Sequence, residues 1–237
     1  MKITVIGTGN IGSKYNSASY MIDDDILIDM PNGMCKYLRK MDVDVEKVKH
    51  VLLTHFHGDH YFDVPFYLLL KVQADDKEAN IYCDKKGSKK IKKLTELAFP
   101  FDIEEINDKV NPMYHSDKIF KIYDYIVHKY HVDHGPMKQS YGYVFEKEGK
   151  KVGFTGDTTI CKEVEYMASI CEYLICECTN IEGTNEHMGI NYLTKLVEKY
   201  PGCKYLITHM NDKTRETLMK QKINNVTILK DGDILEI

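Results

Sequence analysis

The chain has 237 residues, of which 43% are hydrophobic and 29% are charged, and its formal net charge is −4. This length and apolar content are sufficient for one large core, so we expect a single domain spanning residues 1–237. The negative balance argues against a protein that coats nucleic acid through its whole surface.

Targeting and redox signals are weak. No segment approaches the roughly 18 consecutive apolar residues of a membrane span, and the apolar start at residues 1–6 is too short for a secretory signal. We therefore expect a cytoplasmic protein without a membrane partner.

The seven cysteines are odd in number and lie mostly within apolar runs, which favours reduced, packed thiols. Cys176 and Cys178 lack zinc-knuckle spacing, so we assign them a structural role.

Short apolar strands alternate with helical patterns along the chain. The strands are predicted at 3–6, 19–22, 26–29, 48–54, 80–83, 119–122, 125–132, 140–145, 151–155, 173–177, 205–208, 226–229 and 234–237. The helices are predicted at 34–40, 64–72, 89–98, 162–169, 192–200 and 215–223. A hairpin turning at Glu148–Gly149 does not fit a purely parallel sheet, so the pattern indicates an α/β fold with two mixed sheets flanked by helices.

Four metal-capable side chains follow a buried strand pattern within six residues: His55, His57, Asp59 and His60. Alternate residues of a strand share a face, so we expect His55 and His57 to leave the strand in parallel. Gly58 is expected to let the backbone turn Asp59 and His60 back toward them. Without a metal these groups would compete for protons in a dry core. The segment therefore predicts ligands for zinc, manganese or iron.

Other predicted strands also end in metal-capable residues. Asp29 is the last residue of the strand predicted at 26–29, where a poorly solvated carboxylate is expected to support a ligand or a loop. His134, Asp157 and His209 follow later strands. Strand ends on one rim of a sheet converge in space, so these residues are expected to complete the site. His131 is expected to be an ordinary packed or solvated histidine.

These residues together resemble the metallo-β-lactamase superfamily of binuclear hydrolases, whose motif is His-x-His-x-Asp-His followed by a His, an Asp and a His on later strands. The resemblance extends from Gly7-Thr8-Gly9 through His209 and implies an αββα four-layer sandwich. It also implies two divalent ions per chain, with zinc expected first and manganese or iron as alternatives. One ion would be held by His55, His57 and His134, the other by Asp59, His60 and His209, and Asp157 would bridge both.

The chemistry implied is hydrolysis by a water that two cations activate. Asp59 is expected to orient this water or to accept its proton. In ribonuclease Z-like members of the superfamily a His precedes the helix before the final ligand strand, and His187 resembles that residue. We expect His187 to donate a proton to the leaving group.

The substrate expectation is a phosphodiester. An Asp stands at position 157, where the β-lactamases carry a cysteine, and the segment from His134 to Gly142-Tyr143 resembles the ribonuclease Z-like group. The tRNA-grasping arm of that group has no room in 237 residues, so a small nucleotide-like phosphodiester is favoured over RNA. A lactone or thioester hydrolase is the alternative within the superfamily, and a homodimer is compatible with either function.

Two further motifs have competing interpretations. The run from Gly7 to Gly12, with Asp29 about 20 residues from its start, spells a dinucleotide-binding fingerprint, and a binding module is the alternative from another functional class. Such a module needs a helix at the third glycine, but residues 13–20 are poor in helix formers. Six lysines between Lys85 and Lys93 are expected to form a solvated helix face, or else a phosphate-binding patch.

Overall fold

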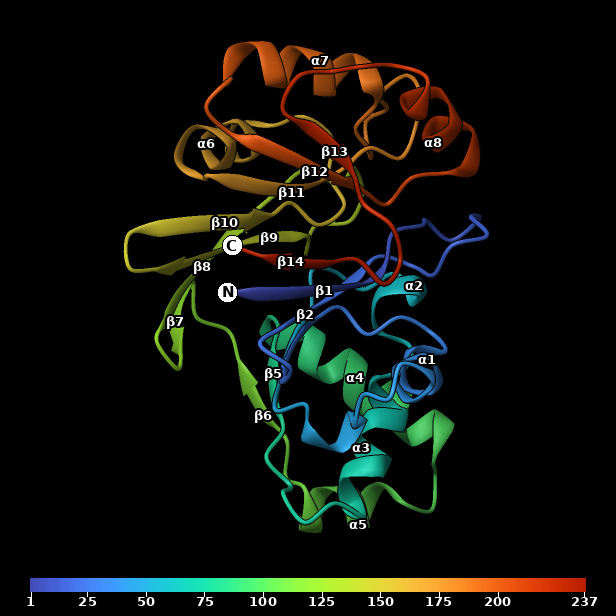
Figure 1. Cartoon of the computed structure of the whole chain (residues 1–237). Helices are drawn as coiled ribbons and strands as arrows, with labels where there is room; N and C mark the ends of the chain where they lie inside the picture. The colour runs from blue at the N-terminus through green and yellow to red at the C-terminus, as the bar shows by residue number, and fades with distance from the viewer. The chain divides into compact units, whose positions relative to one another are not determined.

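Fourteen strands form two mixed β-sheets of seven strands each in the computed structural model, which describes residues 1–237 (Figure 1). Each sheet belongs to its own unit. The first unit contains residues 1–7, 18–116 and 232–237, and the second contains residues 8–17 and 117–231. Both sheets carry helices, so the prediction of two mixed sheets flanked by helices is confirmed. The single domain over 1–237 stays a prediction.

The first unit combines antiparallel and parallel strand pairs. Across its sheet the strands are β14 (Ile234–Glu236), β1 (Lys2–Gly7), β2 (Ser19–Ile22), β3 (Ile26–Ile28), β4 (His50–Leu52), β5 (Asn80–Tyr82) and β6 (Met113–His115). Pairing is antiparallel from β14 to β3 and parallel from β3 to β6. The helices are α1 (Met34–Lys40), η1 (Val45–Lys47), α2 (Gly58–Tyr61), α3 (Val64–Val72), α4 (Lys85–Ala98) and α5 (Ile103–Lys109).

The core of the first unit lies between its sheet and helices α1, α3, α4 and α5. Val51 and Leu53, two residues apart in the central strand segment, are both fully buried in this core, as strand alternation requires. Leu38, Tyr67 and Ile91 pack there from three different helices. Leu52 between them is also fully buried, so β4 is buried on both faces. Its parallel pairing with β3 and β5 sets the point at which the histidine-rich segment begins.

The second unit follows the same plan with different strand directions. Across its sheet the strands are β13 (Val226–Ile228), β12 (Lys204–Thr208), β11 (Tyr173–Glu177), β10 (Lys150–Phe154), β9 (Tyr141–Lys147), β8 (Tyr125–His131) and β7 (Ile119–Ile122). Pairing is parallel from β13 to β10 and antiparallel from β10 to β7. The helices are α6 (Lys162–Ile170), α7 (Ile190–Lys199) and α8 (Asp212–Met219), which lie on one face of this sheet (Figure 1).

The strand directions in the second unit bring four strand ends to one edge. Strands β10, β11 and β12 are parallel, and β8 runs in the same direction because two antiparallel pairings separate it from β10. Leu174, Cys176 and Ile207 bury against the helices. The carboxyl ends of β8, β10, β11 and β12 therefore meet at the same edge of the sheet.

Most predicted elements are present, with several corrections. Helix α4 begins at Lys85 rather than at residue 89, and α8 covers Asp212–Met219 rather than 215–223. Elements α2, α5 and β6 were not predicted. The apolar face of α4 is short, because Ile91 is buried whereas Leu97 is 72% exposed.

The glycine-rich segment does not open a helix. Residues 13–18, which follow the third glycine, contain no helix. Gly9 is needed for close packing, since a Cβ there would lie 2.8 Å from both Ser13 Cβ and Tyr15 O. A pyrophosphate site requires a helix N-terminus at this point, so the structure argues against the dinucleotide-binding alternative.

Three smaller expectations have clear outcomes. The predicted hairpin turn joins β9 to β10 with positive φ at both Glu148 and Gly149. All seven cysteines are free thiols, and six of them are buried. None of the helices combines the length and the apolar character that a membrane-crossing segment needs.

Candidate functional site

In the first unit, Asp29 and Thr54 meet because they follow neighbouring parallel strands. Ile28 of β3 pairs with Leu52 of β4, so the residues just beyond both strands come together. The Thr54 N–H donates to Asp29 Oδ1 at 2.7 Å, and the Thr54 hydroxyl donates to Asp29 Oδ2 at 2.7 Å. Asp29 has a φ of 60°, a left-handed conformation that is uncommon for a residue with a side chain. The predicted supporting role of Asp29 thus has a structural basis.

Asp29 also orients a histidine. His60 Nδ1 lies 2.7 Å from Asp29 Oδ2, so this nitrogen donates its proton and the Nε2 atom keeps its lone pair. Burial raises the pKa of the Asp29 carboxyl, and the hydrogen bonds from His60 and Thr54 act in the opposite direction. The carboxylate therefore depends on these donors to remain ionised.

The remaining candidates in the first unit converge on a small volume. Thr54 Oγ1 gives its proton to Asp29, so it accepts from His55 Nδ1 at 3.1 Å. His55 then presents Nε2, which lies 3.0 Å from His57 Nδ1, with the two rings nearly perpendicular at 85°. The rings of His55 and His60 are 4.0 Å apart, centroid to centroid. The two strand-end histidines converge through different ring nitrogens rather than projecting in parallel.

Gly58 has a different role from the one expected. It begins the short helix α2, and its φ is not positive. A Cβ at Gly58 would lie 2.7 Å from the Phe62 ring, so the glycine makes room for that ring. The helical turn, rather than a glycine reverse turn, places the carboxylate of Asp59 3.8 Å from His60 Nε2.

In the second unit the remaining predicted residues follow strand ends at one edge of the sheet. His134 lies beyond β8, Asp157 beyond β10 and His209 beyond β12, and all three are buried. His209 Nε2 lies 3.2 Å from Asp157 Oδ2. His134 Nδ1 donates to the carbonyl of Glu186 at 2.7 Å, which leaves Nε2 with its lone pair.

The structure adds one buried carboxylate that the sequence had not singled out. Glu177, the last residue of β11, is 1% exposed. Its Oε1 accepts from Thr158 N at 2.9 Å and from His187 Nδ1 at 2.8 Å. Its Oε2 accepts from Thr179 N at 3.0 Å and from Thr179 Oγ1 at 2.7 Å. Four donors to one carboxylate make Glu177 the centre of a polar network.

This network reaches His209 through a threonine. The Thr179 hydroxyl gives its proton to Glu177, so it accepts from His209 Nδ1 at 2.8 Å. That bond fixes the tautomer of His209 and directs its Nε2 toward Asp157. His209 also has a left-handed backbone, with a φ of 50°. Strand position, backbone turn and hydrogen bond together orient one imidazole.

His187 lies in the loop before α7 and joins the same cluster. Its ring stacks on His209 at 5.5 Å and contacts His134 edge-on at 4.8 Å, measured between centroids. Burial alone would lower the pKa of His187, but the hydrogen bond and charge of Glu177, helped by Asp157, raise it to about 9. Glu177 thus favours the protonated form of His187 and accepts from its Nδ1.

The second unit contains two groups of possible metal-binding residues. Within each group, the nitrogen or oxygen atoms that could bind a metal lie within 4.8 Å of one another. The first group is His134, Asp157 and His187, and the second is Glu177, His187 and His209. His131, in contrast, is exposed and donates from Nε2 to the Lys138 carbonyl at 2.8 Å. His131 is therefore a solvent-exposed histidine that is hydrogen-bonded to the chain seven residues further on.

A comparison with family models covers nearly the whole chain. The model described as "Anti-Pycsar protein Apyc1" matches residues 1–235. The chain belongs to the Apyc1 family. Curated relatives of this Apyc1-family chain include the ribonuclease Z of Methanococcus maripaludis strain C5, which is 30% identical over 152 residues, or 60% of the chain. That match covers 47% of the relative, so the chain spans about half the length of this protein.

A second ribonuclease Z, from Staphylococcus carnosus strain TM300, is 21% identical over 281 residues, and the match covers 90% of the chain and 89% of the relative. Among solved structures, YhfI from Bacillus subtilis has a TM-score of 0.80 at 20% identity, covering 99% of both chains. A diphosphatase of the PhnP family has a TM-score of 0.79 at 18% identity, covering 100% of this chain and 97% of its own. The Apyc1-family chain therefore has the metallo-β-lactamase fold, in the ribonuclease Z-like branch of that superfamily.

Proposed function

We propose that this protein is a metal-dependent hydrolase that cleaves a small phosphodiester. The main support is the set of four buried histidines, His55, His60, His134 and His209, each of which uses Nδ1 to donate to an oxygen. Each therefore presents Nε2 as a lone-pair donor, the arrangement in which histidines bind divalent metals. Membership of a hydrolase superfamily supports the same function.

The donor atoms fit divalent cations. Two ligands of a tetrahedral zinc ion, each bound at about 2.0 to 2.1 Å, are about 3.3 Å apart. His55 Nε2 and His57 Nδ1 are 3.0 Å apart, and His209 Nε2 and Asp157 Oδ2 are 3.2 Å apart. Imidazole and carboxylate together favour zinc, with manganese or iron as alternatives.

The family resemblance assigns the ligands to two cations. His55, His57 and His134 would hold one, and Asp59, His60 and His209 the other, with Asp157 binding both. When bound, two such cations lower the pKa of a water and stabilise negative charge on the phosphoryl oxygens. This binuclear assignment is part of the proposal.

Two side chains of the protein are proposed to transfer protons in this reaction. We propose that Asp59 accepts a proton from the attacking water while the bond from the water oxygen to phosphorus forms. His187 Nε2 gives a proton to the leaving oxygen as the phosphorus–oxygen bond breaks. Glu177 holds His187 through Nδ1, which leaves Nε2 for this transfer. The two residues thus act as general base and general acid.

A small substrate is favoured over RNA by the short connections of the second unit. The longest connection between its consecutive elements is residues 178–189, which leaves no inserted arm. A nucleotide-like phosphodiester, including a cyclic nucleotide, is therefore the substrate class proposed. A lactone or thioester substrate remains the alternative within the same superfamily.

The function is tested by metal analysis together with a substrate comparison. The purified chain should contain about two zinc, manganese or iron ions, as expected for a two-metal hydrolase. It should hydrolyse bis(p-nitrophenyl) phosphate and cyclic nucleotides faster than lactones or thioesters, lose this activity on chelation and regain it when metal is restored. Faster turnover of a lactone or thioester would reassign the substrate. Absence of metal with binding of NAD or FAD would instead favour a binding module.

Replacing Glu177 with glutamine tests the polar network. The amide has lone pairs on only one side, so it cannot accept all four donors that surround Glu177. We expect zinc affinity or kcat to fall by about 10-fold to 100-fold, the usual effect of losing a group that orients a ligand. Competition with a zinc chelator and steady-state kinetics measure the two effects. Glu172→Gln, at an exposed position just before β11, is the matched control and should match the parent protein.

A further inference from the structure

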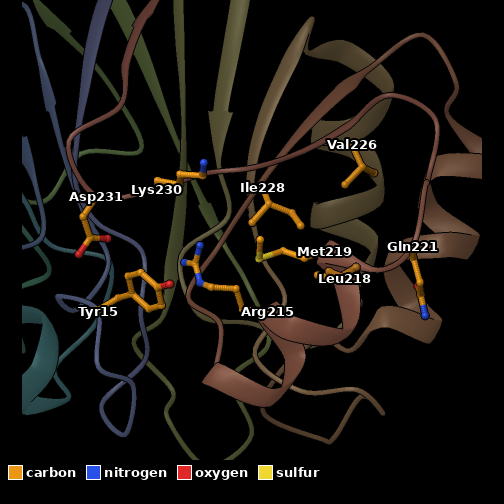
Figure 2. A pocket seen from close by; sticks show the side chains of 9 residues that line it. All are labelled: Tyr15, Arg215, Leu218, Met219, Gln221, Val226, Ile228, Lys230 and Asp231. Atoms are coloured by element: carbon orange, nitrogen blue, oxygen red, sulfur yellow. The ribbon is translucent and has the colours of Figure 1, made fainter.

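A pocket of about 550 Å³ opens within the second unit, between the loop 8–17, helix α8 and the segment from β13 to Asp231 (Figure 2). This volume lies in the range of small-molecule sites, about 300 to 1,000 Å³. None of its lining residues belongs to the proposed metal ligands or to the Glu177 network. It is therefore a separate cavity that the hydrolytic function does not use.

One end of the pocket is cationic and held rigidly. The Arg215 guanidinium donates from Nη1 to the Leu229 carbonyl at 2.8 Å and from Nη2 to Thr8 Oγ1 at 2.6 Å. The Tyr15 ring covers it, with Arg215 Cζ 4.1 Å from the ring centroid. Figure 2 shows Lys230 at the same end of the pocket. Two positive charges, one of them immobilised, therefore lie at this end.

The one carboxylate in the lining is engaged by other donors. Asp231 Oδ1 accepts from Thr8 Oγ1 at 2.6 Å, and Asp231 Oδ2 accepts from Asn16 N at 2.9 Å. These bonds tie Asp231 to the loop, but both donors are neutral and do not cancel its negative charge. Two cationic side chains and one carboxylate line this end, and the excess of one positive charge favours an anion there.

The other end of the pocket is aliphatic. Figure 2 shows Leu218, Met219, Val226 and Ile228 on the side away from Tyr15. Leu218 is buried, whereas Met219 is 65% exposed at the rim. A ligand that fills this pocket thus meets apolar side chains along its body and cations at its head. That combination matches an amphiphile rather than a fully polar metabolite.

We propose that this pocket is a second ligand site, and that it binds a small amphiphilic anion consisting of an apolar chain or ring with one carboxylate or phosphate. The anionic group lies toward Arg215 and Lys230, and the apolar part lies against α8 and β13. The hydrogen bonds of Arg215 to Leu229 and Thr8 hold its guanidinium in place before the ligand binds. This reduces the conformational entropy that is lost on binding.

The test is a calorimetric titration of the 237-residue chain with octyl phosphate, octanoate, octanol and octylammonium. Both anions should bind, and octanol should bind more weakly than they do. Octylammonium should bind at least about tenfold more weakly than the anions, because the cationic end of the pocket repels its positive charge. Methionine methyl groups labelled with ¹³C report the location, since the Met219 signal, identified with Met219→Leu, should shift. The titrations are repeated after chelation, because an anion bound to the metals would be lost whereas binding in this pocket would persist.

One introduced charge and one charge reversal complete the test. Met219→Glu and Lys230→Glu each place a negative charge in the lining and should weaken anion binding by at least about tenfold. Met113→Glu, at a site in β6 that is 52% exposed, and Lys222→Glu, exposed outside the lining, are the matched controls and should bind like the parent. Lys230→Met is the milder variant if the reversal unfolds the protein, as judged by circular dichroism. Equal binding of octylammonium and octanoate, an unshifted Met219 signal, or loss of binding on chelation would each overturn the proposal.

Discussion

Replacing Asp157 with alanine is expected to abolish hydrolysis and to lower the metal content. The side chain lies beyond β10, is 3% exposed, and places Oδ2 3.2 Å from His209 Nε2. Losing a carboxylate that is proposed to bind both cations would remove a ligand and two negative-charge contacts at once. We expect kcat/KM for bis(p-nitrophenyl) phosphate to fall by at least about 1,000-fold, comparable to or larger than the loss of one charge-stabilising group in other enzymes.

The measurement for Asp157→Ala combines initial rates with metal analysis of the dialysed protein. Asp124→Ala is the matched control, because that side chain is 82% exposed and lies in the same unit. The control should retain parent rates and metal. Full activity of Asp157→Ala with two metals bound would refute the assignment of Asp157 as a ligand.

Replacing His187 with alanine should slow turnover and leave the metal content unchanged. His187 is proposed to protonate the leaving group, and loss of a positioned general acid typically costs about 100-fold to 10,000-fold. The loss should be largest for alkoxide leaving groups, which need a proton. It should be much smaller for p-nitrophenolate, which departs readily as an anion.

The measurement that tests His187→Ala is the loss of turnover for substrates with an alkoxide leaving group divided by the loss for substrates with p-nitrophenolate. His131→Ala is the control for removing an imidazole, because His131 is exposed in the same unit. It should affect neither substrate. If His187→Ala slows p-nitrophenyl and alkyl esters equally, His187 does not donate the proton. If it also removes metal, the residue acts in metal binding instead.

Local patterns were enough to select most of the candidate site residues. An apolar run that ends in a histidine or an aspartate marks a strand end, and His55, Asp157 and His209 were found in this way. The pairing of these ends into two sheets followed from the mixed parallel and antiparallel pattern. The neighbouring positions of Asp29 and Thr54, by contrast, depend on strand order, which the sequence does not state.

Glu177 was missed because its role depends on residues distant in sequence. Its flanking cysteines are buried, so Cys176 and Cys178 suggested only a packed strand. The partners Thr158 and His187 reach the carboxylate from 19 and 10 residues away. The one available signal was its position at the end of a strand pattern parallel to those of Asp157 and His209.

The predicted helix boundaries were wrong where a capping residue stabilises a helix whose first turn contains weak helix formers. Helix α4 includes Gly87 and Ser88, which are weak helix formers, yet Asp84 caps it by accepting from Gly87 N at 2.5 Å. A Cβ at Gly87 would lie 2.1 Å from the Phe56 ring, so packing requires the glycine. Helix α5 buries only Ile106, and so it has no apolar period to detect.

The pairing of β1 with β14 has a consequence for synthesis on the ribosome. Lys2 pairs with Glu236 and Thr4 with Ile234, so β1 is translated long before its partner strand β14. Until residues 234–236 leave the exit tunnel, one side of β1 offers unsatisfied backbone groups to any neighbouring nascent chain. β1 can pair with β2 soon after both have been translated, but its other edge stays open to non-native strand pairing until β14 is available.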